Sequence, residues 1–146
     1  MSQKSTFFID GAISPQFIAD SIAKHSSKTN IGAHDIFLGQ VRNDLIQGKE
    51  VIAIDYSSFE EMAISTLSEI RETMFSKYNL SCLHVYHSKG LVKVGEICLF
   101  VFVSSKHRKD AFDACRDLVE EIKHKIPIFG KEVFEDETFT WKKNIL

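Results

Sequence analysis

The chain has 146 residues, of which 44% are hydrophobic and 26% are charged, and its net charge is −2. This length is enough for one domain with its own core, so we expect a single domain over residues 1–146. The charge balance gives no support to a general nucleic-acid-binding role, and no apolar run reaches the roughly 18 residues that a membrane-spanning helix needs.

The cysteines and the N-terminal residues indicate the cellular compartment in which the protein is expected. Cys82, Cys98 and Cys115 form no CxxC pair and lie in apolar segments, which is typical of buried thiols in a reducing environment. The first residues, MSQKSTFFIDG, lack the apolar stretch of a signal peptide. We therefore expect a cytoplasmic protein.

The first half of the chain alternates strand-like and helix-like patterns. Strands are expected at residues 6–9, 31–41 and 50–56, and helices at residues 15–24 and 60–78. Gly32 and Gly39 indicate close packing or a bulge in the second strand. The buried stripe of the second helix is predicted to contain Ala63, Leu67, Ile70 and Met74.

The second half of the chain begins with two more expected strands, at residues 81–88 and 97–103, with a turn at residues 89–90. The run ICLFVFV at residues 97–103 is unbroken by charge, which is typical of a central strand buried on both faces. His84 and His87 lie three residues apart, so on a strand they face opposite sides and are poorly placed to share a metal.

A long amphipathic helix follows. Ser104 or Ser105 could provide its N-cap, and Pro127 ends the helical pattern. Its apolar stripe is Ala111, Cys115, Leu118 and Ile122. Strands at residues 131–134 and 138–142, joined by a turn at 135–137, then form a C-terminal hairpin. The fold class is therefore α+β, with a mixed, mainly antiparallel sheet, two principal helices and a C-terminal β-hairpin.

The start of the long helix is basic. Lys106, His107, Arg108 and Lys109 follow one another where the helix dipole is positive. Cations beside free backbone N–H groups would suit an anion, most naturally a phosphate. A solvated basic turn is the alternative interpretation.

The far end of this helix carries Lys123. Its spacing from Phe112 and Val119 places it at the edge of the apolar stripe. A partly desolvated lysine there is a better base or nucleophile. The pattern alone favours the alternative, a lysine whose stem covers apolar surface and whose charge suits a helix C-terminus. Arg108 and Lys123 are roughly 22 Å apart along one helix, so they reach one small ligand only if a second subunit contributes.

Other standard chemistry is missing from the sequence. We find no P-loop, GxGxxG, HExxH or GxSxG motif, and we expect neither a metal site nor a cofactor. Arg42, which follows a predicted strand, either presents its guanidinium to an anion or forms a surface ion pair.

Five segments, taken together and in this order, resemble the large, catalytic subunit of molybdopterin synthase. They are GAHDIFLGQVRND (32–44), YSSFEEMA (56–63), HSKGLVKVGE (87–96), SSKHRKDAFDAC (104–115) and KHKIPIFGKE (123–132). The resemblance covers roughly residues 30–143 and implies an α/β-hammerhead-like fold.

The resemblance also implies an activity. Members of this family are sulfurtransferases that convert cyclic pyranopterin monophosphate into molybdopterin by adding the two dithiolene sulfurs. The sulfur arrives as a thiocarboxylate at the C-terminus of a small ubiquitin-like partner subunit. The large subunit forms the homodimer core of a heterotetramer.

The resemblance assigns roles to individual residues. Arg42, His107 and Arg108 correspond to substrate-binding positions of the family, and Lys123 to its catalytic lysine. A second family lysine is replaced by Gly130 in the segment PIFGKE. Lys131 is the nearest substitute, if the strand bulges, and Lys142 is the other residue that could supply the charge.

Two further functions compete with the enzyme. The first is a non-catalytic paralogue with the same fold that binds a phosphopterin or a partner protein. Gly130 supports this alternative, because it replaces a family lysine. A nucleic-acid-binding module would need a continuous basic face with exposed aromatic residues, and we do not expect one.

Overall fold

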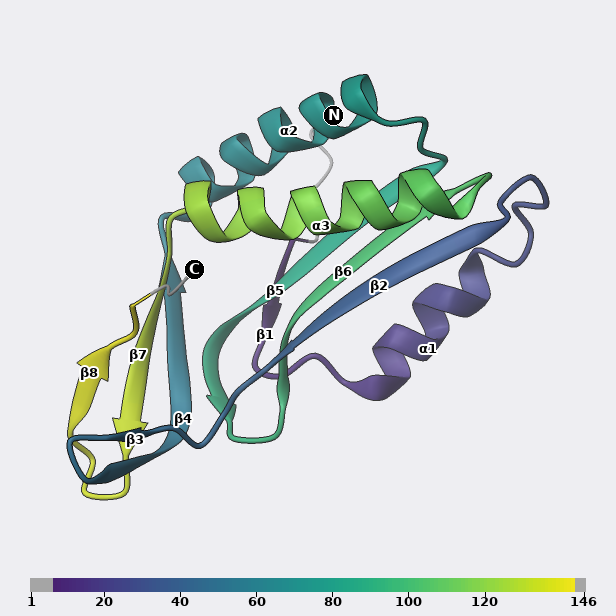
Figure 1. The fold of residues 1–146 in the computed structure, drawn as a ribbon. Coiled ribbons are helices and arrows are strands. Elements are labelled where there is room, and N and C mark those ends of the chain that lie inside the picture. The colour runs from purple at the N-terminus through teal and green to yellow at the C-terminus, as the bar shows by residue number, and fades with distance from the viewer. Residues whose placement is uncertain (1–6, 144–146) are drawn as a thin grey trace.

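The computed structural model describes residues 7–143 and consists of a curved sheet with helices on both faces (Figure 1). The helices are α1 (Pro15–Lys24), α2 (Glu60–Lys77) and α3 (Arg108–Lys125). The strands are β1 (Phe8–Asp10), β2 (Ala33–Gln40), β3 (Leu45–Ile46), β4 (Lys49–Ser58), β5 (Cys82–Lys93), β6 (Ile97–Ser105), β7 (Ile128–Phe134) and β8 (Phe139–Trp141). Within the described range no helix combines the length and the apolar character that crossing a membrane would require.

The sheet has the strand order β2-β6-β5-β4-β7-β8. The pairings along this order are antiparallel, β3 pairs antiparallel with β4, and β1 is parallel to β5. The predicted α+β class with a mixed, mainly antiparallel sheet and a C-terminal hairpin is confirmed. The weaker predicted helix at 15–24 is also present, as α1.

Helices α2 and α3 cover one face of the sheet and α1 covers the other (Figure 1), with a separate apolar layer on each face. The larger one joins α2 and α3 to the sheet and includes Leu67, Leu83 and Leu118, while the smaller one packs Ile18 of α1 against Phe100 and Phe102. Alternate side chains of β6 therefore serve opposite layers. The prediction that β6 is buried on both faces is confirmed, since residues 98–105 are all buried.

The two long helices follow their predicted apolar stripes. All four predicted stripe residues of α2, and all four of α3, are buried. The predicted serine N-cap of α3 is wrong: the N-cap residue is His107, and Ser104 and Ser105 still belong to β6. Pairing with β2, through Ala33 opposite Ser105, extends the strand over both serines.

One predicted turn is also wrong. We expected the chain to reverse at residues 89–90, but β5 continues to Lys93. Gly90 adopts a φ of 85° and pairs with Tyr56 of β4. Residues 82–87 of β5 pair with β6 and residues 90–93 pair with β4. Gly90 thus lies where one long strand passes from one neighbour to the next.

The other strand boundaries differ by a few residues. β1 begins at Phe8, and residue 6 of the predicted strand lies outside the described residues. β3, a two-residue strand, was not predicted. The close packing expected at Gly32 is confirmed, because a Cβ there would lie 2.2 Å from the Lys106 carbonyl oxygen. The bulge expected at Gly39 is confirmed by a register shift between Gly39 and Gln40.

Candidate active site

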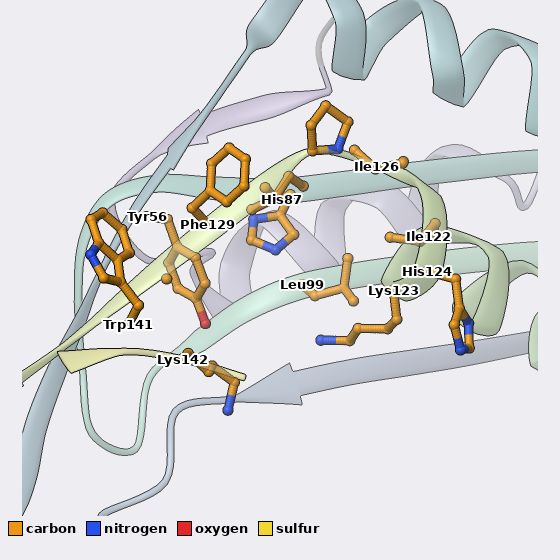
Figure 2. Close-up of a pocket in the computed structure, with 13 residues that line it drawn as sticks. Tyr56, His87, Leu99, Ile122, Lys123, His124, Ile126, Phe129, Trp141 and Lys142 are labelled. Carbon is orange, nitrogen blue, oxygen red and sulfur yellow. The ribbon is translucent and has the colours of Figure 1, made fainter. Parts of the chain in front are cut away.

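A pocket of about 330 Å³ lies at the C-terminal end of α3, beside the β7–β8 hairpin (Figure 2). Its lining combines apolar and aromatic side chains with a few polar groups, as in most small-molecule sites. The lining residues are Tyr56, His87, Leu99, Ile122, Lys123, His124, Ile126, Pro127, Ile128, Phe129, Gly130, Trp141 and Lys142. None of these described lining residues is acidic.

Lys123 lies in the last turn of α3 and points into the pocket (Figure 2). Part of its side chain remains exposed, yet burial lowers the pKa of its ammonium group. The Cys98 thiol opposes this shift, whereas the positive charges of Lys142 and Arg42 add to it. The lowered pKa favours a partly desolvated ammonium group over one fully in water, and the catalytic role of Lys123 stays a prediction.

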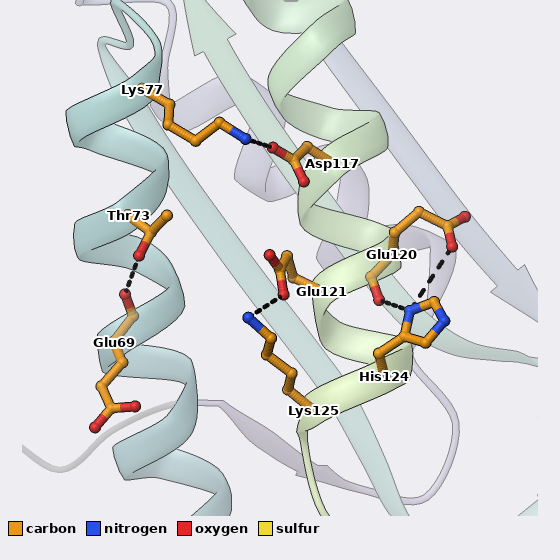
Figure 3. A network of polar contacts seen from close by, with 8 residues as sticks. All are labelled: Glu69, Thr73, Lys77, Asp117, Glu120, Glu121, His124 and Lys125. Atoms are coloured by element: carbon orange, nitrogen blue, oxygen red, sulfur yellow. Dashed lines mark hydrogen bonds and ion pairs between the residues drawn. The ribbon is translucent and has the colours of Figure 1, made fainter.

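The next two basic residues of α3, His124 and Lys125, contact residues one turn earlier in the same helix (Figure 3). Lys125 Nζ lies 2.7 Å from Glu121 Oε2, and His124 Nδ1 lies 2.6 Å from the Glu120 carbonyl oxygen. Higher on the same helix, Asp117 contacts Lys77 of α2 at 2.6 Å, which links the two helices. At the basic end of α3, Lys125 is therefore held in a surface ion pair, whereas Lys123 and His124 line the pocket.

Lys142 is the second lysine of the pocket. Its backbone N–H donates a hydrogen bond of 2.7 Å to the Gly130 carbonyl oxygen, which fixes the residue beside β7. Lys131 does not line the pocket. Its ammonium group lies over the rings of Phe139 and Trp141, 4.4 and 5.5 Å from their centroids.

Gly130 occupies a tightly packed position in the pocket wall. A Cβ built there would lie 3.0 Å from Ile54 Cγ2 and 3.4 Å from Tyr56 Cε1. A side chain at position 130 therefore requires Ile54 to move by a few tenths of an ångström. The register of β7 shows no bulge at Gly130, since Gly130 and Lys131 pair in sequence with Tyr56 and Asp55. Lys131 therefore keeps the face opposite to Gly130.

The three other predicted substrate-binding residues lie at two places. Arg42 follows β2 and its guanidinium contacts Asp44 twice, at 3.2 Å each. It is exposed, but its charge reaches Lys123. His107 and Arg108 lie at the opposite end of α3 and do not line the pocket.

Among the pocket residues that were not predicted as site residues, His87 and Tyr56 contact each other. His87 of β5 is buried, its Nδ1 lies 2.8 Å from the Ser88 carbonyl oxygen, and burial lowers its pKa to about 4. Tyr56 of β4 contacts the His87 ring edge-on at 4.9 Å. Burial and a hydrogen bond with Cys98 raise the pKa of Tyr56. Both residues lie in segments that carry the family resemblance, which is the only hint that the sequence offers.

The pocket therefore presents the ammonium groups of Lys123 and Lys142 and the neutral imidazole of His87 to a ligand. Because His87 donates its Nδ1 hydrogen to Ser88, its Nε2 carries the lone pair. Two cations without a carboxylate among the described lining residues favour an anionic ligand. A lysine with a lowered pKa also exchanges protons more readily near neutral pH.

Comparison with known proteins identifies the family to which this fold and this pocket belong. Residues 12–125 match the family model described as MoaE protein, which is more than half of the chain. The chain belongs to the MoaE protein family. The match includes Lys123 but ends before Gly130 and Lys142, so the MoaE comparison covers only one of the two pocket lysines.

Curated MoaE relatives are named molybdopterin synthase catalytic subunits. The protein of Pyrococcus abyssi is 35% identical over 122 residues, which are 84% of this chain and 81% of that protein. The protein of Bacillus subtilis is 33% identical over 117 residues, 80% of this chain and 74% of that protein. The rat protein is longer: the 34% identical segment of 113 residues spans 77% of this chain and 56% of the rat protein.

Solved structures share the fold. Molybdopterin synthase from Staphylococcus aureus superposes with a TM-score of 0.83 at 26% identity, covering 98% of this chain and all of the other. A complex of subunits 1 and 2 of the molybdopterin-converting factor from Helicobacter pylori has a TM-score of 0.80 at 20% identity, covering 94% of this chain and 89% of that chain. At the latter identity, the likeness concerns the fold alone.

Proposed function

We propose that this chain is the catalytic subunit of a molybdopterin synthase and acts in molybdenum cofactor biosynthesis. It is an enzyme that transfers sulfur, as its membership of the MoaE family and the names of its relatives support. The observation that carries the proposal is the placement of Lys123. The lysine that corresponds to the family's catalytic residue points into the pocket and has a lowered pKa.

The proposed substrates are both anions. Cyclic pyranopterin monophosphate carries a phosphate group, and the small ubiquitin-like partner subunit ends in a thiocarboxylate. The ammonium groups of Lys123 and Lys142 provide charge for such ligands, and Arg42 adds to the positive potential nearby. Lys123 orients the thiocarboxylate or transfers a proton while sulfur is added to the substrate.

The partner subunit approaches the open side of the same pocket. Phe129 and Trp141 line the pocket while 42% and 53% of their respective surfaces remain exposed. Aromatic side chains at a pocket rim provide apolar contacts for an extended peptide tail. The Helicobacter structure that shares this fold, described as a complex of two subunits, supports a two-subunit assembly.

A homodimer brings the remaining residues to the site. Within one copy, His107 and Arg108 lie at the other end of α3 from Lys123. In the proposed dimer, these residues reach the pocket of the second subunit and bind the substrate phosphate. Two such dimer-related pockets, each served by one small subunit, give the proposed heterotetramer.

The test is reconstitution from purified components. The parent chain is mixed with cyclic pyranopterin monophosphate and the thiocarboxylated small subunit, and molybdopterin is measured over time. We expect turnover by the parent and none when the small subunit ends in an ordinary carboxylate, because that control carries no sulfur. Absence of turnover in the parent, with the components shown to be intact, would contradict the proposal.

A non-catalytic paralogue is the second candidate, and Gly130 is the observation that favours it. The tight contact with Ile54 leaves little room for a lysine at this position. The same reconstitution decides between the two functions. A paralogue would bind the small subunit or the phosphopterin in a calorimetric titration and form no molybdopterin.

A further inference from the structure

Three potential metal ligands converge on the sheet face that α1 covers, away from the pocket. His25 is the C-cap residue of α1, and Cys82 and His84 lie on β5. Cys82 and His84 are two residues apart, so they project from the same face of the strand, opposite to the pocket residue His87. Their ligand atoms and that of His25 all lie within 4.8 Å of one another.

The two imidazole rings present their Nε2 atoms to each other. His25 Nε2 lies 3.1 Å from His84 Nε2, and His25 Nδ1 lies 2.7 Å from the Ser21 carbonyl oxygen. The carbonyl can only accept, so Nδ1 of His25 carries the hydrogen and the Nε2 lone pair points at the cluster. A histidine that donates one ring N–H to a backbone carbonyl is the usual arrangement of a metal ligand.

The separations suit a small tetrahedral ion. Bonds of about 2.0–2.1 Å to nitrogen and about 2.3 Å to sulfur place two nitrogen ligands about 3.3 Å apart and a nitrogen and a sulfur about 3.6 Å apart. The observed nitrogen separation is 3.1 Å. The sulfur lies within 4.8 Å of both nitrogens, so a modest side-chain rotation of Cys82 would complete the geometry.

The cluster is largely buried and packs against an aromatic side chain. His25 and Cys82 are each 8% exposed, and the His25 ring packs against Phe102 at 4.6 Å. His34 is the fourth nearby group, with its ring centroid 6.0 Å from that of His25.

We propose that His25, Cys82 and His84 bind one zinc ion, or another borderline-soft divalent cation, that fastens the end of α1 to β5. The fourth position is taken by water. A thiolate and two imidazoles are the ligand types that zinc prefers over calcium or magnesium. The site is separate from the pocket and needs neither the substrate nor the partner subunit.

The alternative to a metal site is a simple hydrogen bond between His25 and His84, with the Cys82 thiol taking no part. Cobalt(II) distinguishes the two, because it replaces zinc and shows a charge-transfer absorption only when a thiolate is bound. The full-length chain is stripped with a chelator and titrated with Co²⁺ and then with Zn²⁺, following absorbance and the thermal unfolding midpoint. We expect one equivalent of Co²⁺, a sulfur charge-transfer band that Zn²⁺ abolishes, and an unfolding midpoint that rises with metal.

The variants His25→Gln and Cys82→Ser should each weaken metal binding by at least about tenfold. Cys115→Ser, which removes another buried thiol, serves as the matched control and should bind like the parent. Circular dichroism of the metal-free variants checks that each still folds, and His84→Gln replaces any variant that does not. The proposal is overturned if the parent shows no charge-transfer band, or if the band survives in folded Cys82→Ser or is lost in Cys115→Ser.

Discussion

Lys123 and Lys142 line the same pocket, and the positive charge of Lys142 is one of the causes that lower the pKa of Lys123. The two residues come from the end of α3 and from the residue after β8, and are 19 positions apart in the sequence. The hydrogen bond between the Lys142 N–H and the Gly130 carbonyl keeps the second lysine at this place. Two like charges that line one pocket favour an anionic ligand, because the anion offsets the repulsion between them.

Replacing Lys123 with alanine should abolish most of the activity. A residue that orients the thiocarboxylate or transfers a proton contributes about 10²–10⁴-fold to the rate. The measurement is molybdopterin formation in the reconstituted system. Lys125→Ala is the matched control, because Lys125 lies on the same helical turn but pairs with Glu121 at the surface. Equal rates for the two variants would contradict the role of Lys123.

Replacing Lys142 with alanine should shift the pH profile of the reaction. The charge of Lys142 lowers the pKa of Lys123, so its removal should raise that pKa and move the corresponding limb of the profile to higher pH. Lys131→Ala is the control. Lys131 does not line the pocket, and its ammonium group lies over the rings of Phe139 and Trp141. This variant should therefore keep the parent profile and lose only about 0.5–1 kcal/mol of stability. A profile shifted by Lys131→Ala instead would assign the second lysine to position 131.

Mixing two inactive variants should restore activity if the site is shared between subunits. In a dimer of Lys123→Ala with Arg108→Ala, one pocket carries both changes and the other carries neither. Random exchange of subunits should therefore recover about a quarter of the parent activity. Mixed dimers are made by co-expressing differently tagged chains and are isolated by purification on both tags. Molybdopterin formation by these mixed dimers should reach about half of the parent activity, because one of their two pockets is unchanged. A mixed dimer without activity would contradict the shared site, because it would mean that Lys123 and Arg108 of the same subunit serve one pocket.

His87 should make folding stability depend on pH. Its folded pKa is lowered to about 4 by burial, from an ordinary value of 6.5. Between these values the unfolded chain binds a proton that the folded chain does not, so the free energy of unfolding falls as pH decreases through this window. The contribution is at most about 1.4 kcal/mol per pH unit.

The variant His87→Asn tests this prediction, because asparagine keeps an N–H that can donate to the Ser88 carbonyl but does not titrate. Urea unfolding of the parent and of the variant is compared at several pH values between 4 and 7. We expect the difference in free energy of unfolding between the two proteins to narrow or reverse as pH falls. An unchanged difference across the window would show that His87 does not titrate there.

The helices and the central strand could be predicted from local patterns. Periodic apolar residues define α2 and α3 because a helix on a sheet buries one stripe, whatever the rest of the chain does. The charge-free run of β6 is likewise sufficient for a strand buried on both faces. The predicted strand boundaries were wrong where pairing with a distant strand decides them. Ser105 belongs to β6 because Ala33 pairs with it, and β5 continues through Gly90 because Tyr56 pairs with Gly90.

The sequence by itself determined the family and the fold class, and it singled out Lys123 as a candidate, because these depend on ordered segments and on helical spacing. The tertiary structure decided which residues share a site with it. Lys142 rather than Lys131 lines the pocket, since side chains on a strand alternate between faces and the hairpin brings the end of β8 alongside Gly130. It also brought His25 to His84, 59 residues apart in sequence, because the packing of α1 on the sheet joins side chains that no local pattern connects.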